Sequence, residues 1–199
     1  MTSTIKVKDI NPMKVPKKRT SWNTFQNKYL TREDLYRYEW VNGIVEKTKR
    51  DFNMPFMYLH ANLQHRFYDL KNEGILAHLV SNILFLNNVH RLPTISYFNK
   101  KQIRKMSFDE NEIPLFLIEI IQSKDNISKV HERMQNYRDA GVQVVWHLFP
   151  NYEEVHVYSG KNLTSMLVCK ADDICSAKPV LPNFEISVND IFKKPPMPE

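Results

Sequence analysis

The carboxylate that stands out in this sequence is Glu119, because it lies inside the nearly continuous apolar run Leu115–Ile121. A buried charge costs free energy unless it is paired with an opposite charge or binds a metal ion. Glu119 therefore either forms a structural ion pair or holds a cation at a functional site. The run leads directly into a polar loop and a predicted helix, where sites of α/β proteins commonly lie, and this favours the functional interpretation. Glu39 is the second candidate, at the end of a predicted helix; taken alone, it has the position of a surface carboxylate.

Several other catalytic chemistries find no supporting pattern. The seven histidines include no pair at the spacing of two metal ligands on one helix face, since His60 and His65 are five residues apart. His147 lies in a predicted buried strand, as a core histidine would. Cys169 and Cys175 lack the closer spacing and further ligands of a zinc site, so two reduced thiols are expected. All four glycines fall at predicted turns, which excludes a glycine-rich phosphate loop.

The elements before residue 50 determine where Glu39 lies. The segment 21–30 has aromatic residues at helical spacing, and a second short helix is predicted from Thr31 to Tyr38 because Asp34 resembles part of a capping box. Asn42–Gly43 predicts a tight turn that leads into a strand. Glu39 is thus expected between a helix and a strand.

The rest of the chain predicts a sheet with few helices. Residues 56–71 form an amphipathic pattern that Gly74 is expected to end. A further helix is predicted after Asp125 as its cap, ending at Ala140–Gly141. Apolar or alternating segments predict strands within the ranges 75–86, 94–98, 115–121, 142–149, 154–158 and 163–169.

The length and composition fit one folded domain. The chain has 199 residues, of which 42% are hydrophobic, enough for a sizeable core. We expect a basic arm over residues 1–19, a single domain over 20–192 and a proline-rich tail over 193–199. No apolar run is long enough to span a membrane, and the polar N-terminus does not resemble a secretory signal peptide. A cytoplasmic protein is therefore expected.

The positive charge is concentrated at the N-terminus. The formal net charge is +6, and the arm contains the cluster Lys6, Lys8, Lys14, Lys17, Lys18 and Arg19. This arm is either simply solvated, which the commonness of charged tails favours, or it lies on the phosphates of a nucleic acid. The net charge favours polyanionic partners in either case.

Six short motifs occur in order between about residues 20 and 192. They are Arg37–Val45, His60–Leu63, Arg91–Ile95, Phe116–Ser123, Glu132–Val142 with Trp146 soon after it, and Val180–Phe184. Each is weak alone, but the series resembles the Uma (Uma-two) family of restriction endonucleases, a branch of the PD-(D/E)XK nuclease superfamily. The family pattern has Arg-Tyr-Glu in the first motif, Arg-x-Pro-Asp in the third and an apolar strand with a central Glu in the fourth.

The resemblance implies an α/β (α+β) protein with a restriction-endonuclease-like mixed central β-sheet flanked by helices. It also implies phosphodiester cleavage that depends on Mg²⁺ or Mn²⁺. In such sites carboxylates hold a hard cation, which lowers the pKa of a bound water and neutralises the phosphate. Carried over position by position, the catalytic residues are Glu39, Thr94, Glu119 and Arg133, and the metal ligands are Glu119 and Glu39.

The sequence departs from the family at two of these positions. Thr94 stands where the family has Asp, and Arg133 stands where it has Lys. Threonine has no charge to offer a metal ion, so weak metal binding is expected, and arginine stays protonated and cannot act as a base. Ile121 occupies the position at which other branches carry a lysine, and Lys124 and Lys129 are nearby substitutes, although lysines so placed are more often solvated.

The leading hypothesis is a nuclease-fold protein that acts on nucleic acid, DNA rather than RNA, with weakened or redirected metal-dependent cleavage. The alternative is a catalytically inactive relative that binds nucleic acid or a protein partner. A purely structural protein is least favoured, because no structural role calls for Glu119 inside an apolar strand. The sequence leaves a monomer and a homodimer open. We predict that Thr94 and Glu119 lie on adjacent strands facing one cleft, into which Glu39 projects.

Overall fold

The computed structural model describes residues 18–49, 56–69, 74–78 and 83–196. Most of the predicted arm, residues 1–17, and the end of the predicted tail, residues 197–199, lie outside this part of the chain. The elements in order are α1 (Trp22–Phe25), the π-helix η1 (Gln26–Leu30), β1 (Tyr36–Val41), β2 (Ile44–Lys49), α2 (Met57–Asp69), β3 (Ile75–His78), β4 (Leu84–Leu86), β5 (Val89–His90), β6 (Ile95–Phe98), α3 (Lys100–Met106), β7 (Phe116–Ile120), α4 (Ile127–Asp139), β8 (Val144–Phe149), β9 (Glu154–Ser159), the 3-10 helix η3 (Lys161–Leu163), β10 (Ser165–Lys170), β11 (Ile174–Ala177), β12 (Leu181–Ser187) and α5 (Val188–Phe192).

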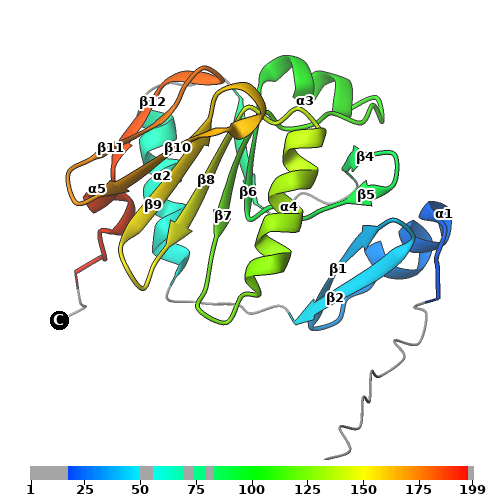
Figure 1. Ribbon diagram of the computed structural model, residues 1–199. Helices are drawn as coiled ribbons and strands as arrows, with labels where there is room; N and C mark the ends of the chain where they lie inside the picture. The colour runs from blue at the N-terminus through cyan, green and yellow to red at the C-terminus, as the bar shows by residue number, and fades with distance from the viewer. Residues whose placement is uncertain (1–17, 50–55, 70–73, 79–82, 197–199) are drawn as a thin grey trace, which may run out of the picture.

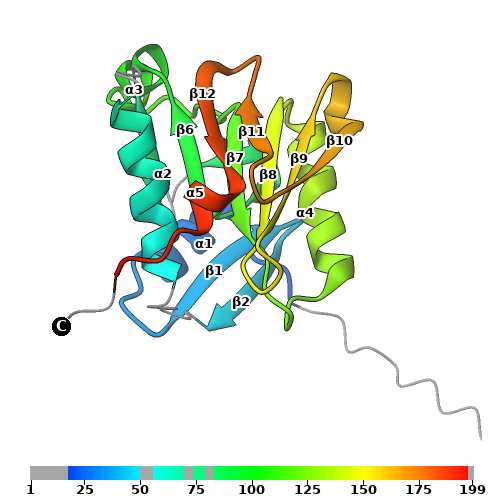
Figure 2. The ribbon, with the colours of Figure 1, turned by 90° about the vertical axis from the view of Figure 1, so that its left-hand side faces the viewer.

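A six-stranded sheet forms the centre of the molecule, in the order β10-β9-β8-β7-β6-β3. β7 and β8 are parallel, with α4 as the crossover between them, and the other neighbouring strands are antiparallel. Helices α2 and α4 lie on opposite sides of this sheet (Figures 1 and 2). The predicted mixed sheet flanked by helices is therefore confirmed.

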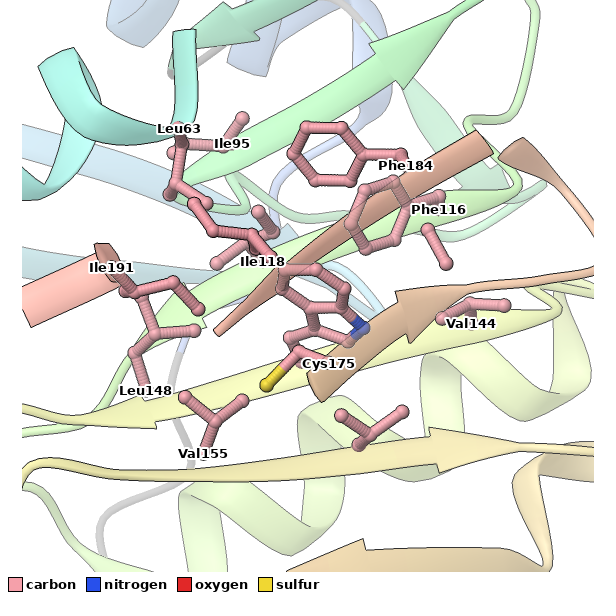
Figure 3. Packing of buried hydrophobic residues seen from close by; sticks show 14 of the residues in the cluster. Leu63, Ile95, Phe116, Ile118, Val144, Leu148, Val155, Cys175, Phe184 and Ile191 are labelled. Carbon is pink, nitrogen blue, oxygen red and sulfur yellow. The ribbon is translucent and has the colours of Figure 1, made fainter. Parts of the chain in front are cut away.

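One face of the sheet packs against α2, α5 and the β11–β12 hairpin. Alternate residues of β7, Phe116 and Ile118, point into this core, as the pleat of a strand requires (Figure 3). Trp146 of β8 stacks on Phe184 of β12 with ring centroids 5.6 Å apart, and both side chains are fully buried.

The opposite face packs against α4. Leu117 of β7 and Val145 of β8 meet Met134 and Tyr137 of the helix in a second buried cluster. Because side chains alternate along a strand, Glu119 lies on the same face as Leu117. The predicted strand 115–121 thus places the carboxylate of Glu119 at the buried interface between the sheet and α4.

A second sheet, in the order β2-β1-β5-β4, lies to one side of the central sheet (Figure 1). Its β1–β2 hairpin turns at Asn42 and Gly43, whose φ angles of 51° and 83° suit the tight two-residue turn predicted there. Phe25 of α1 packs against Tyr38 and Trp40 of β1, which anchors the hairpin. The predicted helix over 21–30 is present as α1 and η1.

The short helix predicted from Thr31 to Tyr38 is wrong. β1 begins at Tyr36, and Asp34 does not cap a helix. Its carboxylate accepts hydrogen bonds from the Tyr36 backbone N–H at 2.9 Å and the Tyr38 hydroxyl at 2.6 Å. Glu39 consequently lies in the middle of a strand with 4% exposure, and its expected position as a surface carboxylate is also wrong.

Two helix details differ from the sequence prediction. α3 was not predicted, because it has no apolar stripe; its signal is the capping box between Asn99 and Gln102. The cap of α4 is Asn126, one residue after the predicted Asp125, whose carboxylate instead accepts a hydrogen bond from the Gln122 backbone N–H at 2.8 Å.

The end of α2 cannot be compared with its prediction, because residues 70–73 lie outside the described ranges. Gly74 has a φ of 119°, and a Cβ there would lie 2.2 Å from the Phe98 carbonyl oxygen, so only glycine fits beside β6. Within the described ranges, no helix has the length and apolar character needed to cross a membrane.

Candidate active site

The site begins where β6 and β7 lie side by side, with Ile95 paired to Ile118. Thr94, immediately before β6, donates hydrogen bonds to Glu119 Oε2 from its backbone N–H at 3.2 Å and from its hydroxyl at 3.1 Å. Thr94 and Glu119 therefore meet on the same face of the sheet, as predicted. Their role in catalysis stays a prediction.

The hairpin brings Glu39 to the same place. Its Oε1 accepts a hydrogen bond from the Leu92 backbone N–H at 2.8 Å, and its Oε2 accepts one from Arg91 at 3.1 Å. Burial would raise the pKa of Glu39, but the charges of Arg133 and Arg91 outweigh it and lower that pKa to about 2. Glu39 is therefore ionised at neutral pH despite its burial.

Arg133 of α4 joins the two carboxylates. One guanidinium nitrogen donates to Glu119 Oε1 at 3.0 Å, and the other donates to Glu39 Oε1 at 2.8 Å. Burial alone would lower the pKa of Arg133, but Glu39 and Glu119 outweigh it and raise that pKa well above its ordinary value. The four predicted catalytic residues thus converge, with a permanent cation between the two acids.

Tyr137 was given no role from the sequence, although it lies within the fifth motif, Glu132–Val142. The fully buried Tyr137 hydroxyl donates to Glu119 Oε1 at 2.5 Å. Burial and the charge of Glu119 raise the pKa of Tyr137 well above its ordinary value, so the phenol stays protonated and acts as a donor. The sequence signal that could have indicated this role is the position of Tyr137 on the buried stripe of the helix, three residues before Ala140–Gly141.

Arg91 was also given no role, and it is the most deeply buried cation of the site. Its side chain is 0% exposed. Besides Glu39, it contacts Glu46 at 2.6 Å, Glu132 at 2.8 Å and the Asn136 side-chain oxygen at 2.9 Å. The local sequence Arg91-Leu92-Pro93 gives no sign of such burial, because the partners of Arg91 come from β1, β2 and α4.

Lys129, predicted as a substitute for the family lysine, is held in ion pairs. Its ammonium group contacts Glu46 and lies 2.9 Å from Glu132. These contacts outweigh partial burial and raise the pKa of Lys129. Lys124 is exposed in the loop before α4, and Ile121 is half-buried there. Lys129 is therefore part of the carboxylate network.

His147 borders the site, because it pairs with Glu119 across the parallel strands β7 and β8. It is 4% exposed, and its ring lies edge-on to Tyr158 with centroids 5.0 Å apart. Burial lowers the pKa of His147 to about 4, so the ring is neutral at physiological pH. The predicted core histidine is therefore buried as expected.

The residues present do not fit a divalent metal ion in this arrangement. All four oxygens of Glu39 and Glu119 accept hydrogen bonds from protein donors. Within the described residues, no group of three or more His, Cys, Asp or Glu side chains is placed to hold a metal ion. The network is four carboxylates against three cations: Glu39, Glu46, Glu119 and Glu132 with Arg91, Lys129 and Arg133.

Comparison with known proteins agrees with this fold. The Uma2 family model, described as "Putative restriction endonuclease", matches residues 22–189. A crystal structure described as a "putative nuclease belonging to DUF820" from Anabaena variabilis ATCC 29413 aligns with a TM-score of 0.64 at 16% identity. The alignment covers 85% of this chain and 96% of that one. A search of curated proteins finds no match.

Proposed function

The chain belongs to the Uma2 family, and on that premise we propose that it binds nucleic acid through a nuclease-like site in which Arg133 takes the place of a metal ion. The family and the fold support a nuclease-type function. The observation that carries the rest is the bridge from Arg133 to Glu39 and Glu119, at 2.8 Å and 3.0 Å.

The bridge has a direct chemical consequence. A divalent ion that needed Glu39 and Glu119 would have to displace a guanidinium that each of them already binds. Arginine remains charged but cannot remove a proton from water, so it can bind a phosphate group without generating a nucleophile. Thr94 adds a hydroxyl and no charge. These residues therefore favour binding, with metal-dependent cleavage absent or weak.

The positive net charge of the chain favours nucleic acid as its partner. The chain carries a net charge of +6. Cationic side chains that neutralise phosphates release counterions, so affinity falls steeply as salt concentration rises. We propose DNA rather than RNA as the partner, following the family description.

A second candidate is a metal-dependent endonuclease. It is favoured by the convergence of Glu39, Thr94 and Glu119 on neighbouring strands of a nuclease fold, and by the 19% exposure of the Arg133 side chain. In this case Arg133 would leave the carboxylates when the substrate binds. Its guanidinium would then contact a substrate phosphate.

The experiment measures binding and cleavage separately. Binding of fluorescent duplex DNA and duplex RNA is followed by anisotropy in EDTA at several salt concentrations, and cleavage is followed on gels with Mg²⁺ or Mn²⁺. We expect salt-dependent binding to DNA in EDTA and uncut DNA with either metal. Cleavage that disappears in Glu119→Ala would favour the second candidate. No binding to either duplex would contradict a nucleic-acid function.

A further inference from the structure

Strand β10 forms one edge of the six-stranded sheet (Figure 2). Its six residues pair with β9 in one continuous antiparallel register, and within the described residues no further strand pairs with its outer side. The outer side of an edge strand presents backbone N–H and C=O groups that can pair with a strand of another molecule. β10 therefore has the hydrogen-bonding capacity of a strand-docking surface.

The side chains of this edge are apolar and exposed. The exposed fractions of three consecutive residues are 53% for Met166, 58% for Leu167 and 41% for Val168. Soluble proteins usually protect an edge strand with a proline, a bulge or charged side chains. β10 has no proline and no bulge, and its one charged residue, Lys170 at its end, is paired with Glu154 at 2.6 Å. The edge is thus left unprotected.

The direction of the backbone groups in β10 determines how a second strand can pair with it. The Lys170 backbone N–H donates to the Asp173 carboxylate at 2.9 Å, and the Lys170 carbonyl oxygen accepts from the Asp173 backbone N–H at 2.9 Å. These groups of Lys170 therefore point away from β9. Because inward and outward positions alternate along an antiparallel strand, the backbone groups of Met166 and Val168 also point outward. An outer strand must bind at these two residues.

β10 is complementary to a second copy of itself. If two copies run antiparallel with Leu167 on a twofold axis, Met166 of each copy lies opposite Val168 of the other. These two pairs exchange the outward backbone hydrogen bonds, and Leu167 lies opposite Leu167 of the second copy. Each exposed apolar side chain of β10 thus gains an apolar cross-strand neighbour, and such pairs stabilise sheets.

The charges beside the strand fit the same arrangement. The continued register brings Lys170 near Thr164 of the second copy, so the lysines of the two strands do not face each other. It also brings the turn that contains Asp173 near the loop that contains Lys161 of the second copy. Both of these side chains are exposed. Opposite charges therefore meet at each end of the pairing, which favours a second copy as the partner.

We propose that the chain forms a homodimer by antiparallel pairing of two β10 strands about a twofold axis at Leu167. The pairing joins the two six-stranded sheets into one. An interface between identical surfaces closes on itself, so it gives dimers and no larger assembly. Because the axis is perpendicular to the joined sheet, the Glu39–Glu119 sites of both copies lie on the same side of it. The proposal rests on the edge strand and is independent of nucleic-acid binding.

Sedimentation equilibrium of the full chain over a range of concentrations tests the dimer. We expect a monomer–dimer equilibrium for the wild-type protein. Leu167→Lys places two like charges opposite each other on the axis and should raise the dimer dissociation constant at least about tenfold. Ile103→Lys is the matched control, because it changes an exposed apolar residue on α3, and it should leave the constant unchanged.

Disulfide cross-linking tests the register. Leu167→Cys places two thiols at a non-hydrogen-bonded pair, where the Cα separation of about 4.5 Å suits a disulfide. Met166→Cys is the matched control, because Met166 is similarly exposed but lies opposite Val168 of the second copy. With oxidised glutathione as the oxidant, we expect Leu167→Cys to form covalent dimers at least about tenfold faster than Met166→Cys.

The outcomes are distinct. A wild-type chain that stays monomeric at every concentration would overturn the proposal and leave β10 to a strand of another protein. Assemblies larger than a dimer, or a dimer that Leu167→Lys leaves intact, would also overturn it. Equal cross-linking of Leu167→Cys and Met166→Cys would reject the axis at Leu167. Circular dichroism of each variant checks that these exposed substitutions leave the fold unchanged.

Discussion

Replacing Arg133 with methionine removes the cation that joins Glu39 to Glu119. The side chain keeps much of its apolar length but loses both hydrogen bonds, at 2.8 Å and 3.0 Å. Removing one partner of a buried ion pair typically costs about 3–5 kcal/mol, because the remaining charge is left uncompensated. Here Glu39 keeps Arg91, and Glu119 keeps Thr94 and the Tyr137 hydroxyl. We therefore expect a loss near the lower limit, about 3 kcal/mol.

The pH dependence of stability reports on all the interactions of Glu39, including the one with Arg133. The pKa of Glu39 is lowered from 4.5 to about 2, which corresponds to about 3 kcal/mol from all its partners together. A carboxylate with a lowered folded-state pKa stabilises the protein above its unfolded pKa, and this stability is lost as the pH falls. Without Arg133 the pKa of Glu39 rises. The stability difference between wild type and Arg133→Met should therefore shrink as the pH falls from about 4.5 toward 2.

The assay is urea unfolding of both proteins at several pH values, with and without Mn²⁺. We expect Mn²⁺ to stabilise Arg133→Met, whose carboxylates lack their bridge, and to leave the wild type unchanged. Lys129→Met is the matched control, since it removes a cation from the same helix that does not contact Glu39 or Glu119. Equal stability of Arg133→Met and wild type at pH 7, or the same Mn²⁺ effect in all three proteins, would refute the reasoning.

Three further changes have defined outcomes. Tyr137→Phe removes a buried donor to Glu119 at 2.5 Å and should cost about 1.5–3 kcal/mol in urea unfolding; a loss below 0.5 kcal/mol would contradict the contact. Thr94→Asp combined with Arg133→Lys should raise Mg²⁺-dependent cleavage above wild type in a gel assay, and adding Glu119→Ala should abolish it. Deleting residues 1–17 should leave the melting temperature almost unchanged and weaken DNA binding more at low than at high salt; a large loss of thermal stability would argue against this.

The part of the fold predicted best is the part that local pattern determines. The run 115–121 is apolar because β7 is buried on both faces, and this made Glu119 conspicuous. Asn42–Gly43 specified the hairpin turn by its backbone preference alone. In both cases the sequence signal and the structural cause are the same.

Glu39 was misplaced because its environment is not local. Thr31 and Asp34 resemble a helix start, but β1 gains partners in β2 and β5 that outweigh this weak propensity. The burial of Arg91 was equally hidden. Its partners Glu39 and Glu132 lie 52 and 41 residues away in the chain, so no short motif could indicate the ion pairs.

The departures at Thr94 and Arg133 were visible in the sequence, but their combined effect was not. An arginine in place of a lysine predicted only the loss of a base. The structure adds that the longer, two-pronged side chain reaches Glu39 and Glu119 at once. The altered residue therefore does more than remove a base, because its guanidinium occupies the two carboxylates that a metal ion would need.

The central claim, that Arg133 takes the place of a metal ion, is tested most directly by calorimetric titration of the wild-type protein with Mn²⁺ and Mg²⁺. Since Glu39 and Glu119 already share a guanidinium, we predict no saturable binding of either ion at these carboxylates. Arg133→Met should acquire such binding. Stoichiometric binding to the wild type that is lost in Glu119→Ala would contradict the account and assign the site to a metal-dependent nuclease.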